Sequence, residues 1–208
     1  MIEVINLTIK YSEKTIINNL SFRIEKGSKL ALKGRSGSGK STILLSLLGF
    51  VKPAKGNIKI NELSVNRSNI KKIRSLTAWV PQELSFDLRF THELLMLPFN
   101  FKINKTALPS QKSVNYILEK FGLNPEILNE ELKHISGGEK QRISLCSSLL
   151  QNKPIILLDE PTSALDNTSK AYITDIFMNN PNITVLSASH DDYWVNNNEQ
   201  NIDITKYH

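Results

Sequence analysis

The sequence has a single cysteine, Cys146, which excludes an internal disulfide and is compatible with a reducing cytosol. We expect Cys146 to be a small, buried, apolar side chain on a helix. Long hydrophobic runs are also absent, because no segment reaches the roughly 18 apolar residues that a membrane-spanning helix needs. The most apolar helical stretch, Ile43–Val51, is too short and contains Ser46 and Gly49. Any work at a membrane is therefore expected to depend on a partner.

A dense basic block is missing as well. Lys and Arg number 26 against 20 Asp and Glu, which gives a net charge of +6. Because the lysines are scattered, we interpret them as a solvated surface and expect no nucleic-acid partner. No secretory signal is visible either, since Met1–Lys10 alternates like a strand. With 40% hydrophobic residues in 208, the chain is expected to be one globular domain.

Strand-like segments at both ends of the chain flank a mostly helical middle. The expected strands are Glu3–Ile9, Thr15–Ile24, Lys29–Leu32, Asn57–Ile60, Pro154–Leu158 and Ile183–Ser187. Helices are expected from Lys40 and over Thr168–Met178, and a short polar tail with a solvated turn at Asn196–Asn198 ends the chain. Strands that alternate with helices predict a mainly parallel sheet. We expect a core of residues 1–83 and 151–208, with a helical subdomain inserted at about 84–150.

A phosphate-loop motif, Gly34–Ser41, fits the pattern G-x-x-x-x-G-K-[ST]. Its glycines let successive backbone N–H groups face phosphate oxygens, and the following helix points its positive end at the same anion. Lys40 is expected to reach the β- and γ-phosphates and Ser41 to bind Mg²⁺. A flexible Gly/Ser linker is the alternative, but the flanking strand and apolar helix favour the phosphate loop.

A second motif places two acids, Asp159 and Glu160, directly after the apolar strand Pro154–Leu158. Ligands of open α/β sheets bind at the carboxyl ends of the strands. Asp159 is expected to hold Mg²⁺, through a water, and Glu160 to orient and polarise an attacking water. The alternative is that both acids cap the strand end in solvent.

The segment Ile135–Arg142 (ISGGEKQR) closely resembles the L-S-G-G-Q signature of ATP-binding cassette (ABC) ATPases. Four further segments match family motifs in order: Tyr11 resembles the adenine-stacking aromatic, Gln82 the glutamine loop, Ser163–Asp166 the dimer-interface loop, and His190 the switch histidine. The resemblance therefore covers nearly the whole chain, from Tyr11 to His190. It departs from the usual signature at Ile135 and at Glu139, and we expect activity to survive both changes.

The resemblance implies an α/β P-loop NTPase fold with a mainly parallel sheet, N-terminal antiparallel strands and an inserted helical subdomain. It implies a Mg²⁺-dependent ATPase with ATP as the nucleotide. The catalytic residues implied are Glu160, His190 and Lys40. The implied nucleotide contacts are Tyr11, Gly34, Arg35, Ser36, Gly37, Ser38, Gly39, Lys40, Ser41, Thr42, Gln82, Ser136, Gly137 and Gly138. The implied Mg²⁺ contacts are Ser41, Gln82 and Asp159.

In this family two chains pack head to tail, so that Ser136 and Gly138 of one chain face the γ-phosphate held by Lys40 of the other. The resemblance also implies a separate transmembrane permease, which would hold the chain on the inner, cytoplasmic face of the cell membrane. Part of Phe86–Phe101 is a hypothetical groove for a helix of that partner.

The sequence leaves other roles open for three of these residues, and other functional classes open for the chain. Tyr11 could pack on the sheet, Gln82 could be an ordinary loop residue and His190 could be structural. An ABC ATPase that works on DNA or ribosomes is a second functional class, although its long coiled-coil or zinc-bearing insertions are not seen here. A phosphate-loop kinase is a third class, and it has no use for Ser136-Gly137-Gly138. The signature region is similar to small bacterial export-type cassettes, and the short segment after His190 leaves little room for an appended domain.

Overall fold

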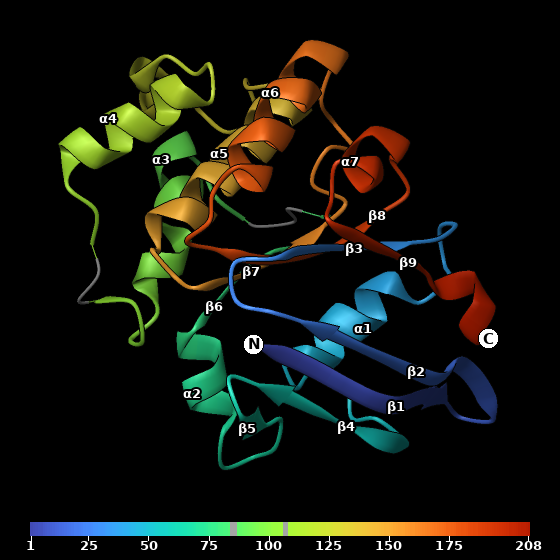
Figure 1. Ribbon diagram of the computed structural model, residues 1–208. Helices are drawn as coiled ribbons and strands as arrows, with labels where there is room; N and C mark the ends of the chain where they lie inside the picture. The colour runs from blue at the N-terminus through green and yellow to red at the C-terminus, as the bar shows by residue number, and fades with distance from the viewer. Residues whose placement is uncertain (84–86, 106–107) are drawn as a thin grey trace.

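Two β-sheets face each other, and helices cover the outer side of the larger sheet (Figure 1). The computed structural model describes residues 1–83, 87–105 and 108–208. The described strands are β1 (Ile2–Tyr11), β2 (Lys14–Ile24), β3 (Lys29–Lys33), β4 (Lys55–Ile60), β5 (Leu63–Ser64), β6 (Thr77–Val80), β7 (Ile155–Asp159), β8 (Thr184–Ser189) and β9 (Gln200–Asp203). The described helices are α1 (Lys40–Leu47), α2 (Ile70–Ser75), α3 (Thr91–Met96), η1 (Leu97–Asn100), α4 (Gln111–Lys120), η3 (Pro125–Asn129), α5 (Gly137–Leu150), α6 (Asn167–Met178), α7 (Asp192–Asn196) and η4 (Ile204–Tyr207).

The larger sheet has the strand order β6-β7-β8-β3-β9, and all its neighbouring strands run parallel. The smaller sheet, β2-β1-β4-β5, is antiparallel. The predicted fold class, a mainly parallel sheet with N-terminal antiparallel strands, is therefore confirmed. Because the strands of the larger sheet are parallel, their carboxyl ends meet at one edge, where ligands of such sheets bind.

The core consists of two apolar layers, one on each face of the parallel sheet. All five residues of β7 are buried, and successive side chains point to opposite faces. Ile155 and Leu157 pack with the antiparallel sheet and α1, whereas Ile156 and Leu158 pack with the helices on the other side. Figure 1 shows α1 between the two sheets. This double burial explains the continuous apolar run that the sequence shows before Asp159.

The prediction of a polar tail after the last core strand is wrong. The segment instead forms α7, then β9, which pairs with β3 at the edge of the parallel sheet, and then η4. Ile204 is fully buried in the core between the sheets. The prediction of a solvated turn at Asn196–Asn198 is wrong for Asn198. Its side chain is buried and donates to the carbonyl of Trp194. Gln200–Asp203 lacks strand-like alternation, and its conformation comes from pairing with β3 and from packing of Ile202 against the core.

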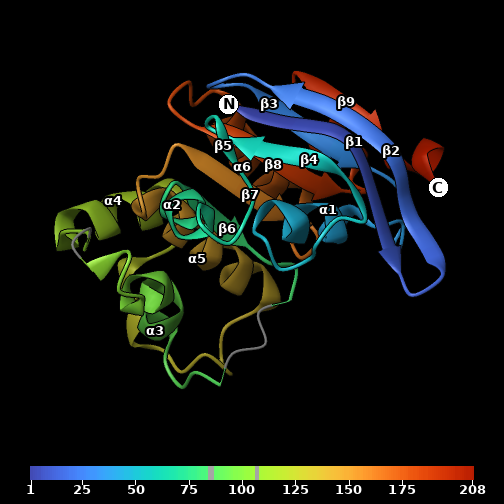
Figure 2. The same cartoon turned by 90° about the horizontal axis from the view of Figure 1, so that it is seen from below.

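Helices α3, α4 and α5 form a group to one side of the sheet (Figure 2). The proposed partner groove falls on this group, and its first residue, Phe86, lies outside the described residues. Leu94, Leu95 and Phe99 are core residues, while Phe101 is exposed. The division into a core and an inserted subdomain stays a prediction.

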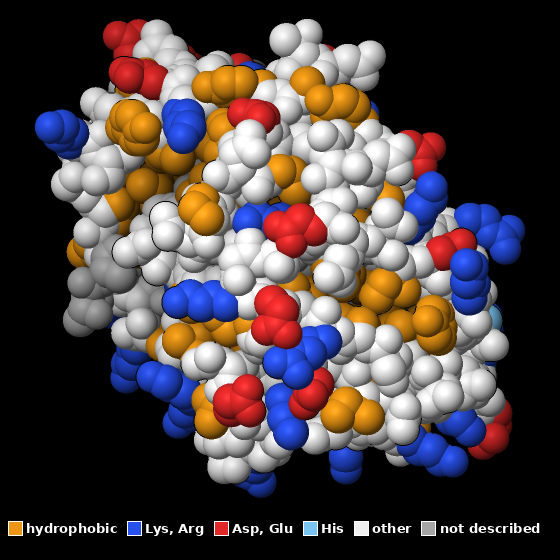
Figure 3. Space-filling view, in the orientation of Figure 1, with side chains coloured by type: hydrophobic (Ala, Val, Ile, Leu, Met, Phe, Trp, Pro, Cys, Tyr) orange, Lys and Arg blue, Asp and Glu red, His pale blue; other side chains and the backbone are white. Residues whose placement is uncertain are grey.

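Surface charge is mixed on the face that Figure 3 shows, where basic and acidic side chains alternate over the lower half of the molecule. The single cysteine, Cys146, is fully buried on α5, as expected. Within the described ranges, every helix is too short or too polar to cross a membrane.

Candidate active site

The phosphate loop connects the end of β3 to the start of α1, at the carboxyl edge of the parallel sheet. Gly37 and Gly39 have φ angles of +77° and +88°, in the left-handed region that favours glycine. A Cβ atom on Gly39 would also lie 2.8 Å from Cγ2 of Ile16. Both the backbone conformation and the space therefore require glycine here, and the loop curls as the sequence pattern predicts.

Lys40, the first residue of α1, lies across this loop. Its Nζ donates to the carbonyl oxygens of Gly34 at 2.8 Å and Arg35 at 3.2 Å, and its side chain is only 5% exposed. The same ammonium lies 3.2 Å from Oε1 of Glu160. A buried cation is thus fixed at the rim of the loop, where an anionic ligand would be attracted to it.

Glu160 joins Lys40 to His190. While Oε1 faces Lys40, Oε2 accepts a hydrogen bond from the backbone N–H of His190 at 3.2 Å and lies 2.9 Å from Nδ1 of the same residue. Glu160 is buried, whereas the side chain of His190 is 63% exposed. The structure therefore brings the three predicted catalytic residues together, although they lie far apart in the sequence.

The backbone at Glu160 is strained. Its φ angle is +50°, a conformation that non-glycine residues rarely adopt and that costs on the order of 1–3 kcal/mol. The N–H of Glu160 donates to the carbonyl of Ala188 at 2.8 Å, which anchors the turn to the end of β8. Strain of this kind persists where the surroundings over-determine the position of a functional group.

Asp159 is buried at the end of β7, next to the phosphate loop. Burial raises the pKa of Asp159, and the nearby hydroxyl of Ser41 opposes this shift. Among the described residues, its Oδ1 is buried without a hydrogen-bond partner. A desolvated carboxylate oxygen beside a hydroxyl suits a hard cation such as Mg²⁺. In residues 1–83, 87–105 and 108–208, no cluster of three or more His, Cys, Asp or Glu offers another metal site.

The signature segment begins α5. Ser136 is the N-cap residue, and its Oγ accepts from the N–H of Glu139 at 3.2 Å. In return, the carboxylate of Glu139 accepts from the N–H and the Oγ of Ser136, both at 2.8 Å. These bonds lower the pKa of Glu139, so its charge stands at the N-terminal end of this helix. The departure from the family signature therefore forms a complete capping box.

Two predicted contacts lie further from this cluster. Tyr11 ends β1 and is 52% exposed, so it is not packed on the sheet, and adenine stacking stays a prediction. Gln82 lies in a hollow of about 330 Å³ that it shares with Gly137, Gln141 and Ala164. The structure thus places Gln82 beside the signature segment, and its contact with Mg²⁺ also stays a prediction.

Sequence reasoning missed the residues that hold the loop after Glu160. Gln141 binds this loop through both ends of its amide. Asp191 binds Thr162 and Lys170 and also caps α7. Gln141 stands inside the quoted signature segment, but only three-dimensional contacts reveal what it binds.

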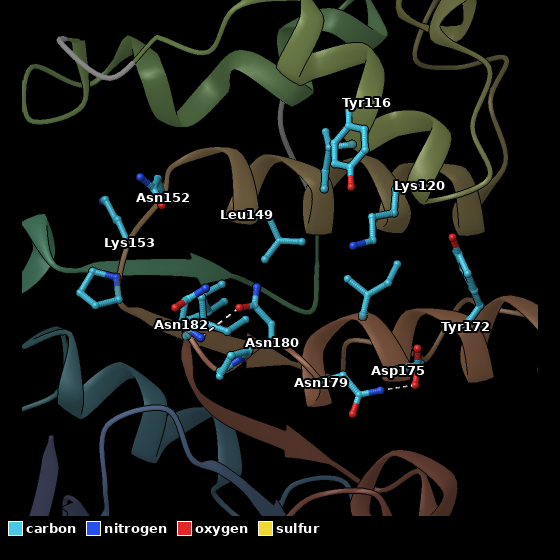
Figure 4. Close-up of a pocket in the computed structure, with 16 residues that line it drawn as sticks. Tyr116, Lys120, Leu149, Asn152, Lys153, Tyr172, Asp175, Asn179, Asn180 and Asn182 are labelled. Carbon is cyan, nitrogen blue, oxygen red and sulfur yellow. Dashed lines mark hydrogen bonds between the residues drawn. The ribbon is translucent and has the colours of Figure 1, made fainter.

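A separate cavity of about 650 Å³ lies elsewhere in the described chain (Figure 4). It adjoins the amino-terminal end of β7, at the sheet edge opposite Asp159. Helices α4, α5 and α6 all end there, where Lys120, Leu149 and Asn179 line it. Helix C-termini carry partial negative charge and disfavour a phosphate. Neither the phosphate loop nor Glu160 lines this cavity, so it is separate from the predicted nucleotide site.

Comparison with known proteins agrees with this geometry. The family model described as "ABC transporter" matches residues 17–163. The chain is 35% identical over 188 residues to the "Phosphonates import ATP-binding protein PhnC" of Fusobacterium nucleatum, covering 85% of this chain and 76% of that protein. It is 33% identical over 210 residues to the "Lipoprotein-releasing system ATP-binding protein LolD" of Buchnera aphidicola, covering 92% and 88%.

Solved structures of an ABC transporter cassette also superpose on this chain. A dimeric bacterial ABC transporter cassette, MJ0796, superposes with a TM-score of 0.85 at 27% identity, covering 98% of this chain and 94% of that one. The same cassette in a post-hydrolysis state with ADP and Pi superposes with a TM-score of 0.83 at 27% identity, with the same coverage.

Proposed function

This chain belongs to the ABC transporter family, and from that premise we propose how its residues power transport through a separate membrane permease. The chain is an ATP-binding and ATP-hydrolysing subunit that acts as a dimer. The observation that carries the residue assignment is the buried Glu160 carboxylate, which contacts Lys40 through one oxygen and His190 through the other.

Each residue of this cluster has a distinct role in the proposal. The N–H groups of the phosphate loop and the ammonium of Lys40 bind the β- and γ-phosphates and balance the charge that develops there. Glu160 accepts a proton from, and orients, the attacking water. His190, exposed on the ligand side and bonded to Glu160, contacts the γ-phosphate and helps to place that water.

Ser41, Asp159 and Gln82 would hold Mg²⁺ in this proposal. When bound, the ion neutralises phosphate charge and orients the phosphate oxygens. The support is the chemistry of the donors, because the partnerless Oδ1 of Asp159 is desolvated next to the Ser41 hydroxyl. The Oδ1 atom of Asp159 therefore keeps an unused acceptor site for the ion.

The dimer is head to tail in this proposal. Ser136, Gly137 and Gly138 of one chain contact the γ-phosphate bound to Lys40 of the other, so ATP joins the two chains. Hydrolysis removes that link and converts chemistry into opening. Tyr11, exposed at the end of β1, stacks on the adenine. The permease selects the cargo and holds the subunit in the cytoplasm, at the inner face of the cell membrane.

A pull-down tests the transport assignment. Tagged Glu160→Gln protein, incubated with detergent-solubilised native membranes and ATP-Mg²⁺, is expected to recover a multi-spanning membrane protein. Lys40→Ala protein is the matched control, since it cannot form the ATP-bound dimer. Recovery of ribosomal or nucleic-acid partners alone would instead place the chain with the ABC ATPases that do not transport.

A further inference from the structure

The amide of Gln141 connects α5 to the loop after Glu160 through two short hydrogen bonds, and Nε2 also donates to Oγ of Ser163 at 3.5 Å. Its side chain is buried, with 7% of the residue exposed. Nε2 donates to the carbonyl oxygen of Glu160 at 2.7 Å, and Oε1 accepts from the N–H of Ala164 at 2.8 Å. A single side-chain amide thus holds both ends of the loop 160–164.

The turn that Gln141 holds is the strained one. Glu160 has a φ angle of +50°, and the hydroxyl and N–H of Ser163 also donate to its carbonyl oxygen, at 3.0 Å and 3.3 Å. A non-glycine residue keeps such a backbone only where several contacts enforce it. Gln141 supplies the shortest of these three bonds, and it comes from outside the loop.

Gln141 connects this loop to the N-terminal end of α5. Gln141 lies five residues after the N-cap Ser136. Gly138 packs against the same loop, since a Cβ atom there would lie 2.9 Å from the carbonyl oxygen of Ala164. The start of α5 and the loop that carries Glu160 are therefore joined at two points.

We propose that Gln141 is a positioning residue for ATP hydrolysis. Its amide fixes the backbone of Glu160, so that the carboxylate faces the attacking water, and it ties that position to the signature end of α5. This inference rests on the proposed function, in which Glu160 activates water and Ser136 faces the ATP of the partner chain. Gln141 contacts no substrate atom and acts through Glu160.

The first test is Gln141→Met in the full chain, because methionine matches the length of glutamine and removes both short hydrogen bonds. We expect kcat for ATP hydrolysis to fall about 10- to 100-fold, since small misplacements of a catalytic group have effects of this size. The KM for ATP and the Kd of a fluorescent ATP analogue should stay within about twofold of the parent values. An unchanged kcat would overturn the inference.

Gln151→Met is the matched control. Gln151 is also 7% exposed, and its Nε2 donates to the carbonyl of Ser147 at the far end of α5. It should keep the parent kcat, and a loss equal to that of Gln141→Met would show a general packing effect and count against the inference. If Gln141→Met does not fold, Gln141→Asn replaces it, because the shorter amide cannot reach both loop groups.

A second measurement distinguishes an effect of Gln141 on Glu160 from an effect of Gln141 on the signature segment. In a Glu160→Gln background, adding Gln141→Met should leave the ATP concentration needed for dimerisation unchanged within about twofold. A much weaker dimer would mean that Gln141 supports Ser136 instead, which overturns the inference. An inactive parent chain would overturn the proposed function itself, whereas an active parent with an equally active Gln141→Met overturns only the role of Gln141.

Discussion

The ammonium of Lys40 lies 3.2 Å from Oε1 of Glu160, and both side chains are almost completely buried. Lys40 comes from the start of α1 and Glu160 from the end of β7, so the fold joins the phosphate loop to the acidic strand through one ion pair. Removing one partner of such a pair leaves a buried charge, whereas removing both charges does not. The first two predictions follow from this pair.

Glu160→Gln should bind ATP like the parent chain but hydrolyse it about 10²- to 10⁴-fold more slowly, because the amide cannot accept the proton of the attacking water. The ATP-bound dimer should then accumulate. Size-exclusion chromatography with ATP-Mg²⁺ and a phosphate-release assay measure both effects. Hydrolysis at the parent rate would exclude Glu160 as the base.

Lys40→Ala should abolish tight ATP binding and lower the free energy of unfolding by roughly 3 kcal/mol, because Glu160 loses its buried cation. Adding Glu160→Gln to Lys40→Ala should restore part of that stability, as urea denaturation would show. Lys33→Ala is the control, since its pair with Asp192 is exposed to solvent and should contribute little to stability. Equal losses for Lys33→Ala and Lys40→Ala would contradict this argument.

Glu139→Gln should strengthen ATP-driven dimerisation about two- to tenfold, because it removes a negative charge from the helix end that faces the partner's phosphate. Gln can still accept both bonds from Ser136, so the capping box survives. The gain should shrink as salt is raised, which a titration of dimerisation against ATP at several salt concentrations would measure. A dimer weaker than that of the parent would contradict the electrostatic argument.

Glu139→Gln should also change how the free energy of unfolding depends on pH. The N–H and hydroxyl of Ser136 lower the pKa of Glu139 in the folded chain below its ordinary value of 4.5. A lowered carboxylate pKa adds stability above the unfolded value, and that stability is lost as pH falls through the folded value. The parent should therefore lose its advantage over Glu139→Gln below about pH 4.5, as urea unfolding at pH 7, 5 and 3 would show.

Gly138→Ala and Gly137→Ala form a matched pair. A Cβ atom on Gly138 would lie 2.9 Å from the carbonyl oxygen of Ala164, whereas one on Gly137 would make an ordinary contact at 3.8 Å with Cβ of the same residue. Gly138→Ala should lower the unfolding free energy of the nucleotide-free chain by about 1–3 kcal/mol. Gly137→Ala should be neutral or stabilising by up to about 1 kcal/mol. Equal effects would show that the contact with Ala164 is unimportant.

Cys146 should react with thiol reagents at least about 100-fold more slowly in the folded chain than in urea. The thiol is fully buried, burial raises the pKa of Cys146, and the thiolate is the reactive form. Absorbance at 412 nm after adding Ellman's reagent, with and without about 8 M urea, measures the ratio. Rapid labelling of the folded protein would mean that α5 opens readily.

Local residue patterns are sufficient to predict the phosphate loop, the acidic strand end and the cap of α5. Each is contiguous, and its conformation follows from local chemistry. Gly37 and Gly39 allow left-handed backbone, the apolar run before Asp159 requires burial on both faces, and Ser136 binds an N–H three residues ahead. The parallel sheet is also predicted by a local pattern, because strands alternate with helices along the chain.

Which of these segments meet depends on the three-dimensional packing of the chain. The edge strand β9 has no apolar pattern, and its conformation comes from pairing with β3. Asn198 is buried although its neighbours suggest a solvated turn. Gln141 lies in the signature segment but binds Glu160 and Ala164, about 20 residues away. These contacts depend on how the sheet and α5 pack together, and packing of distant segments is not encoded in the local residue pattern.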